Sequence, residues 1–117
     1  MAKIDPNKSE SLNSAIAALR REYISRWPEK YNRFEELFRD FVENNQSMEI
    51  LKDLRMEFHR LAGSGGSYGL PAVSEVGHEA EIYIDSLLIS GEGASPEAGE
   101  RIQEFIRALD KIFKDAM

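Results

Sequence analysis

His59 is followed by a run of small side chains, and this combination could do chemistry. A neutral imidazole keeps a lone pair on one ring nitrogen, which can attack an electrophile near pH 7. If the helix that carries His59 continues, positions three, four and seven residues later share its face. These positions hold Ala62, Gly63 and Gly66, which are small enough to let a bulky partner bring an electrophile close.

Cations lie on the other side of this histidine. Arg55 and Lys52 precede His59 by four and seven residues, on the same helix face, and Arg60 follows it directly. Positive side chains favour an anionic group such as a phosphoryl group. The pattern indicates a nucleophilic histidine on an open face. A surface histidine beside glycines that serve only helix packing remains the alternative at this point.

Other kinds of site have less support. The segment 63–66 is rich in glycine like a phosphate-binding loop, but no predicted strand precedes it and no Gly-Lys-Ser/Thr follows. His78 and Glu81 have a spacing that metal ligands use, but no second His/Glu pair stands out. Nothing around the nearby serines indicates a nucleophile elbow or an oxyanion hole. We therefore expect no metal and no cofactor.

The composition is that of a soluble globular domain. The chain has 117 residues, of which 42% are hydrophobic and 31% charged, and its formal charge of −6 argues against nucleic-acid binding. The absence of cysteine excludes a disulfide scaffold and a thiolate zinc site. No apolar run approaches the roughly 18 to 20 residues that span a bilayer, and the N-terminus lacks a signal-peptide core. We expect one stand-alone, monomeric, cytoplasmic domain over residues 1–117, with no membrane contact.

The negative charge is local. Residues 1–55 carry ten basic and ten acidic side chains, whereas residues 56–117 carry five and eleven. No lysine or arginine lies between Arg60 and Arg101. The acidic excess therefore belongs to the second half of the chain, most simply as a solvated face, while the cations lie near His59.

Apolar residues recur at helical spacing almost throughout. We predict helices over about 9–26 and 28–43, a third from about residue 48, a fourth from about 71, and a last one that starts at Ser95-Pro96-Glu97. Pro28 should end or kink the first helix. That helix has an apolar side formed by Leu12, Ala15, Ile16, Leu19, Tyr23 and Ile24. Short connections predict antiparallel neighbours, so the expected fold is all-α: an up-down antiparallel four-helix bundle over about 28–116 with an additional N-terminal helix at about 9–26.

The glycines after His59 are difficult to reconcile with a helix, because each costs about 1 kcal/mol relative to alanine. They argue that the third helix ends at Gly63. The apolar stripe nevertheless stays in phase through Leu61, Gly65 and Tyr68, which favours a helix that continues.

The segment from His59 to Glu81 resembles the histidine-containing phosphotransfer (Hpt) domain of bacterial two-component relays. The family pattern is His-x-Leu-Lys-Gly-Ser, with a glycine ten positions after the histidine. Its matches here are His59, Leu61, Gly63, Ser64 and Gly69. His78 and Glu81 are similar to a pair in the phosphotransfer domains of chemotaxis kinases. Ala62 departs from the pattern, because the family often has lysine there.

The resemblance implies a covalent phosphoryl carrier, and not an enzyme that turns over a free substrate. His59 would accept a phosphoryl group on Nε2 from a receiver aspartate or a kinase and pass it to another receiver. Glu81 would accept a hydrogen bond from Nδ1–H, and Arg55 could replace the missing lysine. The expected partners are response-regulator receiver domains, which would supply Mg²⁺, and a hybrid or other histidine kinase. The expected phosphoryl- or partner-binding residues are Lys52, Arg55, Arg60, Ala62, Gly63, Ser64, Gly66 and His78.

Two other functions remain open. A non-phosphorylated Hpt-like adaptor would bind a receiver or a kinase and regulate it; Ala62 counts slightly for this function and His59 against it. A metal-binding bundle would use His59, His78 and Glu81.

Overall fold

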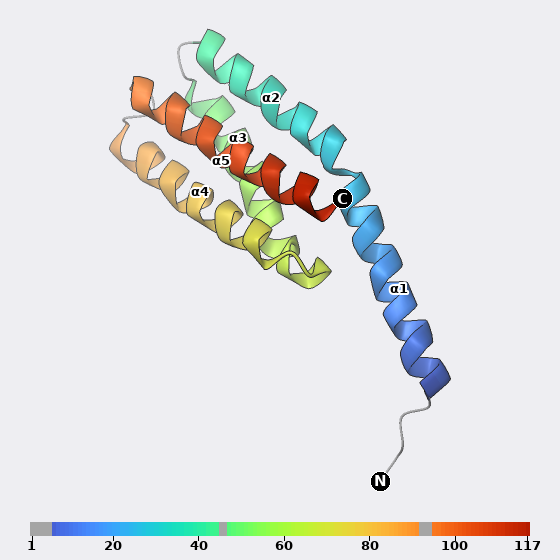
Figure 1. Cartoon of the computed structure of the whole chain (residues 1–117). Helices are drawn as coiled ribbons and strands as arrows, with labels where there is room; N and C mark the ends of the chain where they lie inside the picture. The colour runs from blue at the N-terminus through green and yellow to red at the C-terminus, as the bar shows by residue number, and fades with distance from the viewer. Residues whose placement is uncertain (1–5, 45–46, 92–94) are drawn as a thin grey trace.

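The protein is a bundle of α-helices with one helix that extends beyond it (Figure 1). The computed structural model describes residues 6–44, 47–91 and 95–117. Its helices are α1 (Pro6–Ser25), α2 (Trp27–Glu43), α3 (Met48–Ser64), the short 3-10 helix η1 (Gly66–Tyr68), α4 (Pro71–Ser90) and α5 (Pro96–Ala116). The all-α prediction is confirmed, since α2 to α5 form the antiparallel bundle and α1 is the additional helix.

The helix starts follow from local sequence. Pro28 lies in the first turn of α2, where its missing N–H costs no hydrogen bond, and only Arg26 separates α1 from α2. Ser95 caps α5, because its hydroxyl accepts a hydrogen bond from the Ala98 N–H. Ser47 occupies the predicted cap position of α3, but its side chain makes no capping hydrogen bond there.

The core lies between α2, α3, α4 and α5 and is closed at one end by the last turn of α1. Trp27 is almost fully buried and stacks on Phe113, with ring centroids 4.3 Å apart. The Trp27 indole N–H donates to Asp110 Oδ1 at 2.9 Å, so the start of α2 is tied to the end of α5. The other buried hydrophobic residues include Phe34, Phe41, Leu51, Leu54, Phe58, Leu61, Val73, Ile84, Ile102, Ile106 and Leu109.

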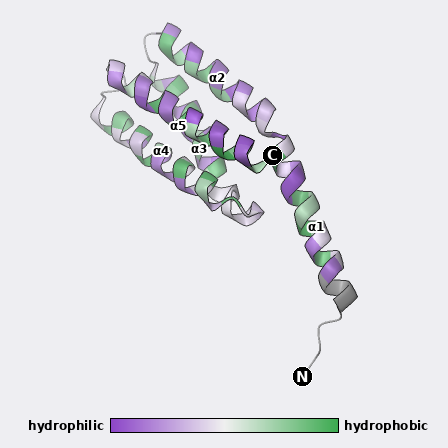
Figure 2. Cartoon of the chain, in the orientation of Figure 1, coloured by the Kyte–Doolittle hydropathy of each residue, from purple (hydrophilic) through white to green (hydrophobic). Residues whose placement is uncertain are grey.

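Only the C-terminal turn of α1 joins this core. Tyr23 and Ile24 are 7% exposed, whereas Leu12, Ile16 and Leu19 on the same apolar side are 52% to 61% exposed. Figure 2 shows hydrophobic residues along α1 where it extends beyond the bundle. The apolar side that the sequence predicts therefore exists, but most of it is exposed.

The glycine-rich segment continues as helix, but in a tighter form. The α-helix ends at Ser64 and a single 3-10 turn follows, so the chain remains helical to Tyr68. Gly69 then reverses the chain with φ 78°, a conformation that glycine adopts without strain. The Tyr68 ring stacks on Tyr23 at 4.3 Å, which holds this turn against α1.

Candidate functional site

Two glycines set how closely α3 and α4 approach. A Cβ atom on Gly77 of α4 would lie 2.8 Å from the Ala62 backbone nitrogen and 2.9 Å from the Phe58 carbonyl oxygen. A Cβ atom on Gly65 would lie 2.7 Å from the Val73 side chain. Since only glycine allows these approaches, the two helices are held in a fixed register along the segment that carries His59.

His59 and Glu81 meet across this contact. His59 Nδ1 lies 2.9 Å from Glu81 Oε1, the side chain of His59 is 57% exposed, and that of Glu81 is only 13% exposed. An ionised carboxylate only accepts hydrogen bonds, so this contact favours the tautomer with hydrogen on Nδ1. The other ring nitrogen, Nε2, has no hydrogen-bond partner among the described residues and retains its lone pair in that tautomer.

Arg55 is bound to acidic residues of α4. Its Nη2 donates to Glu81 Oε1 at 3.1 Å and to Asp85 Oδ2 at 3.4 Å, and its Nε donates to Asp85 Oδ1. The hydrogen bond to Asp85 raises the pKa of Arg55 above its usual value. The charge of Arg55 is therefore already compensated within the protein.

The other two predicted cations do not join this cluster. Lys52 Nζ pairs with Glu49 at 3.4 Å, and Arg60 Nη1 pairs with Glu57 at 3.1 Å. Both pairs lie within α3, and their members are exposed except for Glu57, whose side chain is only 18% exposed. One residue of an α-helix turns the chain by about 100°, so Arg60 lies on a different side of α3 from His59.

The small residues around His59 differ in their surroundings. A Cβ atom on Gly63 would have no heavy atom within 4 Å, so this side of the histidine is open. The Gly66 N–H donates to Ser74 Oγ at 2.8 Å, and Ala62 is half-buried against Gly77. The Ser64 hydroxyl is 2.8 Å from that of Tyr23, which links α3 to α1.

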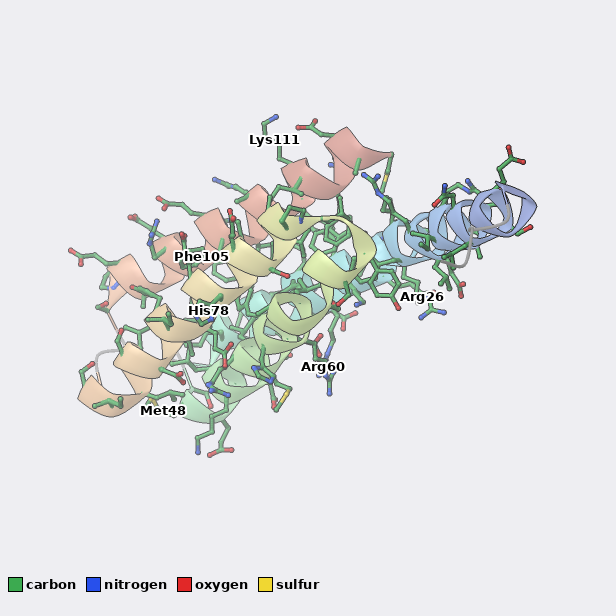
Figure 3. The ribbon with its side chains drawn as sticks, turned by 90° about the horizontal axis from the view of Figure 1, so that it is seen from below. Arg26, Met48, Arg60, His78, Phe105 and Lys111 are labelled. Carbon is green, nitrogen blue, oxygen red and sulfur yellow. The ribbon has the colours of Figure 1, made fainter. Side chains whose placement is uncertain are left out.

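His78 is exposed on α4 (Figure 3) and makes no hydrogen bond or ion pair within the described part of the chain. In the same residues, no three His, Cys, Asp or Glu side chains are arranged to hold a metal ion. The metal-binding alternative therefore gains no support.

Asp85 is the member of the cluster that the sequence reasoning missed. It lies one helical turn after Glu81, and its contact with Arg55 joins residues 30 positions apart. The signal in the sequence was the spacing of Glu81 and Asp85, which places two acids on the same face of a helix.

A histidine bound through one ring nitrogen to an acid on the next helix, on a bundle of this topology, is the arrangement that the resemblance to phosphotransfer domains implied. The model of the Hpt domain family matches residues 18–114. The chain belongs to the Hpt domain family. Comparison with curated proteins and with solved structures found no match.

Hpt domains serve phosphotransfer in two-component signalling as carriers, and this chain shares that general role. The family interacts with receiver domains and with kinases. None of the described helices is long and apolar enough to cross a membrane.

Proposed function

We propose that His59 is the phosphoacceptor of this Hpt domain and that it passes the phosphoryl group between receiver domains. The observation that carries the proposal is the contact of 2.9 Å between His59 Nδ1 and Glu81, on a ring that is more than half exposed. A base that is fixed on one nitrogen and open on the other has the geometry of an activated nucleophile.

The proposed reaction is an exchange of one bond for another. The lone pair of Nε2 attacks the phosphorus of an aspartyl phosphate, the P–N bond forms, and the P–O bond to the aspartate breaks, so that the carboxylate leaves with its electrons. Transfer to a second receiver reverses these steps. Glu81 accepts the hydrogen bond from Nδ1–H throughout and stabilises the positive charge that develops on the ring.

In this proposal the partner protein, and not the Hpt domain, provides the positive charge that balances the negative phosphoryl group. Ala62 provides no cation, and the guanidinium of Arg55 is bound to Glu81 and Asp85. The receiver would contribute Mg²⁺, which stabilises charge on the phosphoryl oxygens. The Hpt domain then supplies the nucleophile and its orientation.

The surface beside His59 suits a docking protein. Met56, one helical turn before His59, is 43% exposed, and Ile82, next to Glu81, is 56% exposed. Gly63, one helical turn after His59, adds an open position on α3. Apolar residues bordered by polar groups are typical of protein–protein contacts.

Labelling by a phosphorylated receiver tests the function. The wild-type protein should acquire phosphate that is labile in acid and stable in alkali, and His59→Gln should acquire none while keeping its helical circular-dichroism spectrum. His78→Gln is the matched comparison, because it makes the same chemical change but keeps the proposed nucleophile, and it should still be labelled. Labelling of His59→Gln would overturn the proposal, and receiver binding by an unlabelled wild-type protein would indicate the adaptor function.

A further inference from the structure

Four side chains form a continuous line across α3 and α4. Asp85 binds Arg55, Arg55 binds Glu81, and Glu81 binds His59. The line alternates between the two helices, and each inner member binds one residue on either side of it in the line. Only the His59 end of this line takes part in the proposed transfer.

The planar shape of the Arg55 guanidinium explains how Asp85 can fix its orientation. A guanidinium is planar, and its Nε and Nη2 hydrogens form a fork that fits the two oxygens of a carboxylate. Asp85 receives this fork on Oδ1 and Oδ2. With the guanidinium plane fixed in this way, Nη2 also donates to Glu81 Oε1 at 3.1 Å.

Glu81 depends on this second donor. Its carboxylate is 13% exposed, so it has little water to compensate its charge, and Oε1 accepts from both His59 and Arg55. Without Arg55 in place, the carboxylate would be free to leave the imidazole for solvent.

We propose that Asp85 is a positioning residue, which fixes Arg55 and thereby holds Glu81 on His59 Nδ1. This inference rests on the proposed function, because the Nδ1–H tautomer matters only if Nε2 is the nucleophile. Arg55 then acts on Glu81, and not on the phosphoryl group in place of the missing lysine.

The test is Asp85→Asn, which keeps the size of the side chain and removes its charge. NMR of the protein labelled with 15N in histidine should show a smaller fraction of the Nδ1–H tautomer of His59. Phosphoryl acceptance at saturating receiver should slow by about 10-fold, as for other residues that orient a reactive group, while the receiver concentration for half-maximal rate stays unchanged. Arg55→Lys should behave similarly, because lysine lacks the fork.

Two further variants separate positioning from a general structural effect. Asp53→Asn makes the same change at an exposed aspartate of α3 that lies on another side of the helix from His59, and it should match the wild type. Asp85→Glu restores the carboxylate and should recover part of the tautomer and of the rate. Wild-type tautomer and rate in Asp85→Asn would overturn the inference. If wild-type His59 is never phosphorylated, the proposed function fails, but the NMR measurement still shows whether Asp85 orients the ring.

Discussion

Beside the exposed ring of His59, Gly63 offers a position where a side chain can be added without disturbing the fold. A Cβ atom there would meet no heavy atom within 4 Å. The residue lies inside α3, and glycine is the least favourable residue in a helix interior apart from proline. The glycine at position 63 therefore does not stabilise the helix, which is consistent with a role in leaving room for a partner protein.

We predict that Gly63→Leu blocks receiver docking while leaving the bundle as stable as the wild type or more stable, by up to about 1 kcal/mol. The leucine would project into the open space beside His59. Surface plasmon resonance with a receiver measures docking, and urea unfolding measures stability. Gly63→Ala is the control, since it gains helix stability with little bulk. Unchanged docking by Gly63→Leu would show that this side of His59 is not part of the contact.

Spacing within one helix identified the residues around His59, and the family resemblance implied the contact of His59 with Glu81 on the next helix. Other contacts between helices were not predicted. Small residues and cations at intervals of three, four and seven can be read directly from the chain. The pairing of Arg55 with Asp85 and of Ser64 with Tyr23 depends on the relative position of separate helices. The spacing of residues within α3 does not show how α3 lies relative to the other helices.

At the scale of helices, Gly77 determines how closely α3 and α4 approach. We predict that Gly77→Ala lowers the free energy of unfolding by about 1 to 3 kcal/mol, because its methyl group would overlap the backbone at Phe58 and Ala62. Separation of the helices should also weaken the His59–Glu81 contact and slow transfer. Urea unfolding and transfer kinetics measure the two effects.

Gly99→Ala in α5 is the matched control for this substitution. A Cβ atom there would have no heavy atom within 4 Å, so the gain in helix propensity should raise stability by up to about 1 kcal/mol. Equal effects of the two substitutions would mean that the approach of α3 to α4 does not require glycine.

The helices themselves were largely predictable, because their ends carry local signals. The predicted range 9–26 corresponds to α1 (Pro6–Ser25), and Pro28 and Ser95 mark the starts of α2 and α5 as expected. What could not be predicted is that most of the apolar side of α1 stays exposed. Periodicity shows that a helix has an apolar face, but it does not show whether another element covers that face.

At the scale of the whole molecule, the hydrogen bond between Trp27 and Asp110 connects α2, the first helix of the bundle, with α5, the last. Burial would raise the pKa of Asp110, but hydrogen bonds from Lys114 and Trp27 outweigh this effect and lower the pKa below its usual 3.8. A carboxylate with a lowered pKa in the folded state stabilises the fold above pH 3.8. This stabilisation is lost as the pH falls through the lowered pKa.

We therefore predict that Asp110→Asn lowers the free energy of unfolding at pH 7 by about 1 to 2 kcal/mol, and that the difference from the wild type disappears in strong acid. Trp27 is the only tryptophan of the chain and is buried, so its fluorescence reports unfolding in urea at each pH. Asp115→Asn is the control, because Asp115 forms an exposed pair with Lys111 and should contribute little at any pH. A difference for Asp110→Asn that is independent of pH would contradict this assignment.

The exposure of the His59 side chain has a consequence for how signalling pathways stay separate. A phosphoryl group carried by His59 would be accessible to any receiver that can approach this helix face, because the side chain is more than half exposed among the described residues. Fidelity would then reside in how well each receiver matches the exposed positions of α3 one helical turn from His59, Met56 and Gly63. If His59 is the phosphoacceptor, exchanging these positions with those of another Hpt domain would redirect the signal without changing the phosphorylated side chain.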